Sequence, residues 1–171
     1  MNPQSMEVLE AIRRRRTVRR YRSRPVEPEK LERLLEAARL APSGMNLQPW
    51  ELVVVTSEEG RRALVPACNN QRQVAEAPVV ICGVDDPGAK WARVDLSLAM
   101  EHVVLEAVEL GLGTCYIGSF RPEMVRRALG VPEERQVVLL LTVGYPAEEP
   151  RDPGKKPLSA IVHRERYTPR G

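Results

Sequence analysis

The sequence predicts an α+β fold formed by one domain, and three observations support this. Segments with helical periodicity and short apolar strands are mixed along the chain without regular alternation, which disfavours a doubly wound parallel sheet. The chain has 171 residues, of which 43% are hydrophobic, as is typical of one compact domain with its own core. No internal repeat or low-complexity linker interrupts it. We therefore expect residues 1–171 to form a single domain.

The first half of the chain is predicted to hold three helices and one strand. Ser5 can cap a first helix, in which apolar residues recur at a spacing of three. A second helix opens at Pro28, because proline is favoured in the first turn, and its apolar face falls within residues 31–38. After a loop, residues 51–56 (ELVVVT) indicate a buried strand, and residues 58–64 indicate a short helix.

The second half is predicted to hold three strands and two helices before an extended tail. The strands are expected at residues 79–84, 114–117 and 137–143, and the helices at residues 93–110 and 122–129. Gly111 and Gly113 are expected to end the first of these helices, and Gly130 the second. From Tyr145 onward, five prolines favour an extended tail.

The helix at residues 93–110 is predicted to be buried on several sides. Its charged residues Asp95, His102, Glu106 and Glu109 fall at spacings of seven, four and three, and so form one narrow polar stripe. Its remaining faces are mostly apolar, so a single contact with one neighbouring element would not cover them.

Charge and cysteine content exclude several classes of protein. No stretch approaches the roughly 18 apolar residues of a membrane span, and the N-terminus lacks the pattern of a signal peptide, so we expect a cytoplasmic protein. Cys68, Cys82 and Cys115 show no CxxC spacing, and the chain has two histidines, so no metal site is predicted. Cys68 is expected in a loop, the other two in the core.

The basic residues are concentrated near the N-terminus. The net charge is +3, yet residues 11–24 contain eight arginines and no acidic residue, which leaves the rest of the chain at −5. Within this stretch, the segment RRTVRRY (residues 15–21) combines guanidinium groups with a hydroxyl group. Such groups can hold a phosphate through charge-assisted, often bidentate hydrogen bonds. The alternatives are a solvated helix end and a nucleic-acid-binding surface. A content of 4% aromatic residues disfavours nucleic acid.

A second segment, residues 38–50 (ARLAPSGMNLQPW), forms an unusual loop between a helix and a strand. Two prolines, a glycine and an asparagine, all typical of turns, indicate its irregular backbone. Asn46 and Gln48 each offer an amide donor and an amide acceptor, which suit the edge of a planar heterocycle. The alternative is a rigid turn in which these amides cap the local backbone.

Together, the two segments resemble the nitroreductase family of flavin enzymes. RRTVRRY lies about 20 residues before A-x-L-A-P-S-G-x-N-x-Q-P-W. Weaker support comes from GLGTCYIGSF after the long helix, from VGYP at the end of the last strand, and from KKPL in the tail. The resemblance spans about residues 6–167.

The resemblance implies an FMN site and assigns residues to it. The residues implied for the phosphate and ribityl chain are Arg15, Arg16, Thr17 and Arg19, with Lys155 or Lys156 reaching the phosphate from the tail. The residues implied along the flavin ring are Pro42, Ser43, Asn46 and Gln48, together with Ile117, Gly118 and Ser119 through backbone groups. No side-chain acid or base is required, so no catalytic residue is expected.

The resemblance also implies a fold and an activity. The expected fold is a sandwich around a mostly antiparallel central sheet, flanked by helices, with an extended C-terminal arm. The expected assembly is a homodimer with FMN at the interface, in which residues from about 145 to 171 lie on the partner. NADH or NADPH would reduce the flavin, and a small organic acceptor such as a nitroaromatic or a quinone would reoxidise it.

Two points about the activity stay open in the sequence. Other chemistries found in this family, such as reductive dehalogenation and flavin fragmentation, are alternatives that sequence does not separate. Little sequence lies between residues 76 and 93 for a helical cover over the flavin.

Overall fold

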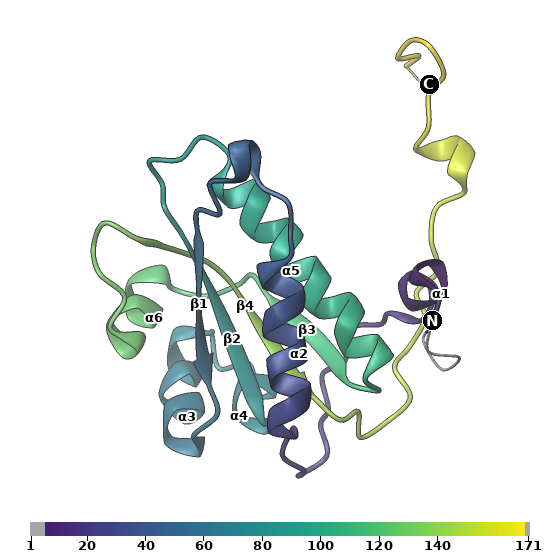
Figure 1. Cartoon of the computed structure of the whole chain (residues 1–171). Helices are drawn as coiled ribbons and strands as arrows, with labels where there is room; N and C mark the ends of the chain where they lie inside the picture. Colours follow the sequence, from purple (N-terminus) through teal and green to yellow (C-terminus); the bar gives the residue numbers. More distant parts are fainter. Residues whose placement is uncertain (1–5, 170–171) are drawn as a thin grey trace.

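The computed structural model describes residues 6–169, which form a four-stranded sheet with helices on both faces (Figure 1). The elements in chain order are α1 (Val8–Arg14), α2 (Pro28–Arg39), the short 3₁₀ helix η1 (Gly44–Asn46), β1 (Trp50–Val55), α3 (Glu58–Ala67), α4 (Gln73–Glu76), β2 (Val79–Asp85), α5 (Ala92–Glu109), β3 (Gly113–Ile117), α6 (Pro122–Leu129), β4 (Gln136–Gly144) and η2 (Leu158–Ala160). The strand order is β1-β2-β4-β3, and every neighbouring pair is antiparallel.

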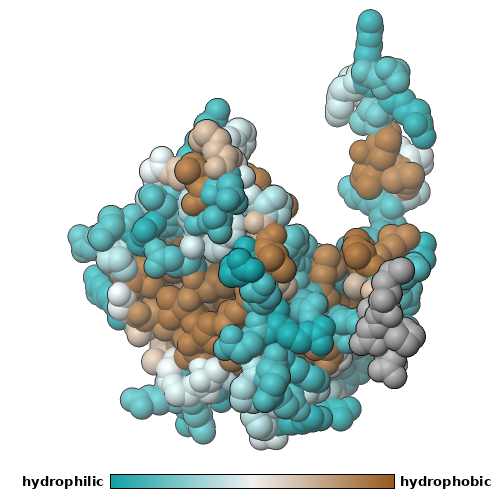
Figure 2. All heavy atoms as spheres, viewed as in Figure 1, coloured by the Kyte–Doolittle hydropathy of each residue, from teal (hydrophilic) through white to brown (hydrophobic). Residues whose placement is uncertain are grey.

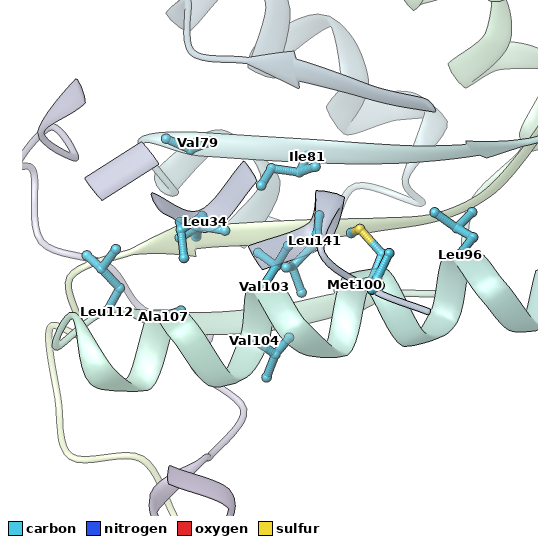
Figure 3. Close-up of a cluster of buried hydrophobic side chains, with 14 residues drawn as sticks. Leu34, Val79, Ile81, Leu96, Met100, Val103, Val104, Ala107, Leu112 and Leu141 are labelled. Atoms are coloured by element: carbon cyan, nitrogen blue, oxygen red, sulfur yellow. The ribbon is translucent and has the colours of Figure 1, made fainter. Parts of the chain in front are cut away.

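Alternating side chains of the central strands supply two separate cores. On β2, Val79 and Ile81 face one side of the sheet, while Val80 and Cys82 face the other, because successive side chains of a strand point to opposite faces. The first side packs against α2 and α5, and the second against α3, α4 and α6. Figure 3 shows Met100 and Val103 of α5 directed towards Ile81 and Leu141 of the sheet.

The polar stripe of α5 faces neighbouring parts of the chain rather than solvent. Nδ1 of His102 lies 3.2 Å from the carbonyl oxygen of Ala37 in α2, and Glu106 forms an ion pair with Arg33 of α2 at 2.6 Å. The carboxylate of Glu109 accepts a hydrogen bond from the backbone N–H of Met6. The stripe therefore fixes how α2 and the N-terminal segment lie on α5.

Several sequence predictions need correction. The predicted cap Ser5 lies outside the described residues, and α1 begins at Val8 after Glu7. α3 is three residues longer than expected, and α4 was not foreseen. Cys68 lies in a turn after α3, as expected, but it is fully buried, and this burial raises the pKa of its thiol to about 11.

The C-terminal arm leaves the body of the protein at an anchored tyrosine. The hydroxyl of Tyr145 donates a hydrogen bond to Glu27 at 2.5 Å and accepts one from Lys30 at 2.8 Å. The Tyr145 hydroxyl is the main cause that lowers the pKa of Glu27 to about 2. Beyond this anchor, Pro146 and Ala147 first pair with the N-terminal segment, and the arm then projects away from the sheet (yellow in Figure 1). Residues 151–162 are exposed.

Candidate functional site

The arginine-rich segment after α1 is held by two isolated β-bridges, one to β3 at the edge of the sheet and one to the start of the arm. Thr17 pairs in parallel with Thr114 of β3, and the backbone N–H of Val18 donates to the carbonyl oxygen of Thr114 at 2.8 Å. Tyr21 pairs with Pro146, and its buried hydroxyl contacts Oγ1 of Thr142 at 2.7 Å. The segment thus lies between the start of β3 and the start of the arm.

Two facing glycines make room for this segment. Gly113 and Gly144 are partners in the β3–β4 pairing. A Cβ atom at Gly113 would lie 2.4 Å from Cγ2 of Val18, and one at Gly144 would lie 2.9 Å from Cδ1 of Tyr21. The prediction that Gly113 ends α5 is therefore wrong. Gly113 is the first residue of β3, and it is needed for the close approach of Val18 rather than for a turn.

The segment forms one wall of a cavity of about 630 Å³, and the start of the arm forms the other. The cavity is lined by Arg15, Arg16, Thr17, Val18, Arg19, Glu148, Glu149, Pro150, Arg151, Asp152, Pro153 and Lys155. Cationic side chains outnumber acidic ones among these residues, so the cavity suits an anionic ligand. All four predicted phosphate residues of the N-terminal segment are present, as is Lys155. Lys156 is exposed and does not line the cavity.

The arginines of the cluster differ in whether a carboxylate lies within ion-pair distance. Arg14, Arg20 and Arg24 pair with the carboxylates of Glu10, Glu76 and Glu27, and Arg16 pairs with that of Asp152. Arg15 and Arg19, by contrast, line the cavity and have no carboxylate within ion-pair distance among residues 6–169. Guanidinium groups that lie in a cavity and have no carboxylate partner can bind a compact phosphate. This arrangement favours a phosphate ligand over a nucleic acid bound along an open surface.

The proline-bracketed loop has an unusual backbone. Met45, Asn46 and Gln48 have φ angles of 52°, 56° and 49°, in the left-handed region that non-glycine residues seldom adopt. The backbone N–H of Gln48 donates to Oγ of Ser43 at 2.9 Å, and Nε2 of Gln48 donates to the carbonyl oxygen of Asn46 at 3.2 Å. Non-glycine residues in this region cluster at ligand-binding sites, so this backbone is consistent with a binding role.

The two amides of this loop differ in what they can still bind. The side chain of Gln48 is engaged within the loop, as the alternative of local capping anticipated. The Asn46 side chain is exposed and makes no hydrogen bond with residues 6–169, so it is available to a ligand. Asp95 of α5 anchors the loop by accepting a hydrogen bond from Gly44 N–H at 3.2 Å, and the side chain of Trp91 packs against Gly44.

The loop and the arginine-lined cavity lie at opposite ends of α5. The loop contacts Asp95 in the first turn of the helix, whereas Thr17 pairs with Thr114, just past its C-terminal end (Figure 1). The helix has 18 residues and is therefore about 27 Å long, because each residue rises 1.5 Å. One chain thus does not bring the predicted phosphate residues and Pro42, Ser43 and Asn46 together.

The third predicted element, residues 117–119, ends β3. The side chain of Ile117 is fully buried, so only its backbone is available to a ligand, while Gly118 borders open space. Ser119 is held by two residues that the sequence analysis missed: Nδ2 of Asn69 donates to its Oγ at 2.9 Å, and Nε2 of Gln71 donates to its carbonyl oxygen at 2.8 Å. The Asn69-Asn70 pair, typical of left-handed turns, was the available signal.

Comparison with known proteins assigns the chain to a family. The model of the nitroreductase family matches residues 12–80 and 68–145. The chain belongs to the nitroreductase family. A relative from Thermus thermophilus named NADH dehydrogenase is 33% identical, and the alignment covers 89% of this chain and 93% of that protein.

Solved structures of nitroreductase-family proteins share the fold of this chain. A nitroreductase family protein from Clostridium difficile is 32% identical with a TM-score of 0.86, over 95% of this chain and all of that chain. The NADPH:FMN oxidoreductase of Vibrio harveyi, solved with NAD⁺, is 25% identical with a TM-score of 0.89, over 96% of this chain and 79% of that one. The expected nitroreductase-like α+β fold is therefore confirmed.

Proposed function

We propose that this nitroreductase acts as a homodimer with one FMN in each subunit interface, and that it passes electrons from NAD(P)H to a small organic acceptor such as a nitroaromatic or a quinone. The protein is a flavin oxidoreductase of the nitroreductase type, with FMN as cofactor and NAD(P)H as co-substrate. FMN supplies the redox chemistry when bound, by taking a hydride equivalent from the nicotinamide and passing electrons to the acceptor.

The cavity residues fit the phosphate end of this cofactor. A phosphate monoester carries close to two negative charges near pH 7 and offers three acceptor oxygens. Arg15, Arg19 and Lys155 supply cationic donors, and Thr17 supplies a hydroxyl group on the same wall. The flavin ring would extend from there towards the backbone of residues 117–119, at the other end of β3.

The main support for the proposal is the distance, within one chain, between the arginine-rich segment and the proline-bracketed loop. The loop that holds Asn46 lies a helix length from the phosphate cavity of its own chain. A second copy can supply its loop to the ring of an FMN held by the first. The proposed site is thus complete only when two subunits meet.

Exposed apolar side chains support the dimer. Leu9 and Ile12 on α1, Val94 on α5, and Leu158 and Ile161 in the arm are all at least half exposed in the single chain. Figure 2 shows apolar residues near α1 and on the projecting arm. Apolar surface of this kind marks interaction sites. The start of the expected arm, residues 145–155, contacts its own chain, so we propose that the part of the arm that follows Lys155 lies on the partner subunit.

Little of the described chain covers the ring-binding loop, so we expect the flavin ring to be open to an acceptor from solvent. β2 and α5 are joined by six residues, 86–91, which form a turn and no additional helix. Of these, Trp91 is half exposed beside Gly44.

No helix among residues 6–169 is long and apolar enough to cross a membrane. The three free thiols are compatible with the proposed cytoplasmic location, where thiols stay reduced.

The function is tested by anaerobic reduction of the bound flavin. We expect the purified protein to be yellow and to lose its visible flavin absorption when NADH or NADPH is added without oxygen. Menadione or a nitroaromatic added afterwards should restore the absorption. Protein that takes up no FMN, or whose bound flavin is bleached by neither nucleotide, would contradict the proposal.

A further inference from the structure

One guanidinium group of the cavity is already committed to a carboxylate of the arm. Nη1 of Arg16 donates to the carbonyl oxygens of Arg13 at 2.5 Å and of Arg15 at 2.9 Å, at the C-terminal end of α1. Nη2 of Arg16 forms an ion pair with Oδ2 of Asp152. The Arg16 side chain is 26% exposed, so it lies largely in the cavity wall rather than in solvent.

Asp152 is held in place for this contact. Its Oδ1 accepts a hydrogen bond from the backbone N–H of Gly154 at 2.9 Å, and Gly154 adopts a φ angle of 75°. The Gly154 N–H and the Arg16 guanidinium lower the pKa of Asp152 below its usual range. The carboxylate is therefore charged at neutral pH, in the wall of a cavity that suits an anion.

We propose that Asp152 competes with the FMN phosphate for Arg16 and so weakens FMN binding. The phosphate and the carboxylate need the same Nη2 donor, and two anions in one cavity repel each other. When the phosphate engages Arg16, the Asp152 contact is given up, and the start of the arm is released from the N-terminal segment. This inference rests on the proposed function, because it assigns FMN to this cavity.

The cavity offers a matched control. Glu149 also lines it, but its carboxylate forms no ion pair with the cations of residues 6–169. Glu149→Gln removes the same charge from the same cavity without freeing Arg16. Asp152→Asn keeps an oxygen that can accept the Gly154 hydrogen bond, so the local turn is preserved.

The test is equilibrium dialysis of the purified protein against a series of FMN concentrations, with bound flavin measured by visible absorption. Asp152→Asn should tighten FMN binding about threefold to tenfold, because the phosphate no longer has to displace a charge-assisted ion pair from Arg16. Glu149→Gln should change the affinity less than twofold. In an Arg16→Ala background, the gain from Asp152→Asn should fall to the level of Glu149→Gln.

Three results would overturn the competition. They are an Asp152→Asn affinity that is unchanged or weaker, a gain that Glu149→Gln matches, and a gain that persists in full without Arg16. Each of these leaves the wild-type FMN site in place. Failure of the wild-type protein to bind FMN would instead overturn the proposed function itself.

Discussion

The variant Arg15→Ala/Arg19→Ala should lose most of its FMN on purification. Both guanidinium groups line the cavity and have no carboxylate partner in the described chain, so a bound phosphate is their natural counter-ion. A hydrogen bond to a charged group contributes about 1.5–3 kcal/mol, so the loss of two should weaken FMN binding on the order of 100-fold or more. Flavin content per chain, measured by absorption after denaturation, checks this.

The matched control is Arg14→Ala/Arg20→Ala. It removes the same charge from the same basic segment, but these two arginines point to Glu10 and Glu76 and do not line the cavity. Their exposed ion pairs contribute little to stability, so this variant should retain its FMN. If the two double variants lost FMN equally, the segment would act through its overall charge and not through a phosphate site.

Gly113→Ala should reduce both the stability of the protein and its affinity for FMN. The new Cβ atom would lie 2.4 Å from Cγ2 of Val18, so Val18 and the segment that pairs with Thr114 must move. Overpacking of this kind typically costs about 1–3 kcal/mol. Because Thr17 and Arg19 flank Val18, we expect FMN affinity to fall as well. Thermal unfolding and FMN titration measure the two effects.

Two further variants locate the cause of this effect. Gly118→Ala adds a methyl group where nothing lies within 4 Å, so it should leave the unfolding temperature nearly unchanged. Val18→Ala in the Gly113→Ala background removes two of the crowded atoms and should restore part of the stability. A Gly113→Ala protein as stable as the wild type, with full FMN affinity, would show that the segment does not depend on this close contact.

The fold was largely predictable because most of its elements are signalled locally. The strands 79–84, 114–117 and 137–143 are apolar runs, and each is found within two residues of its predicted bounds. Pro28 and Gly130 mark a helix start and a helix end, as expected. α4 was missed because four residues carry no readable period. Gly113 was misinterpreted because its role depends on Val18, which lies 95 residues earlier and touches it only in the folded chain.

The sequence predicted which residues belong to the candidate site, but not how those residues are placed relative to one another in the folded chain. The charge pattern indicated the segment at residues 15–21, and the loop composition indicated Asn46 and Gln48, because these features are local in sequence. The resemblance to the family then assigned Arg15 and Arg19 to the phosphate. The partner of Arg16 could not be read in this way, since Asp152 lies 136 residues away. Nor could the sequence show that Gln48 is engaged within its loop whereas Asn46 is available.

The most direct test of the two-subunit site is complementation between two defective chains. One chain carries Arg15→Ala/Arg19→Ala. The other carries Asn46→Trp, which places a large ring on the exposed loop where the flavin is proposed to lie. Different affinity tags allow the mixed dimer to be isolated, and its flavin content is then measured.

Each variant alone should hold little FMN. In the mixed dimer, one interface combines the intact arginines of one chain with the intact loop of the other, so we expect one FMN per dimer, half the wild-type content. If the mixed dimer were as empty as its two parents, each site would lie within a single subunit, and the central claim would be wrong.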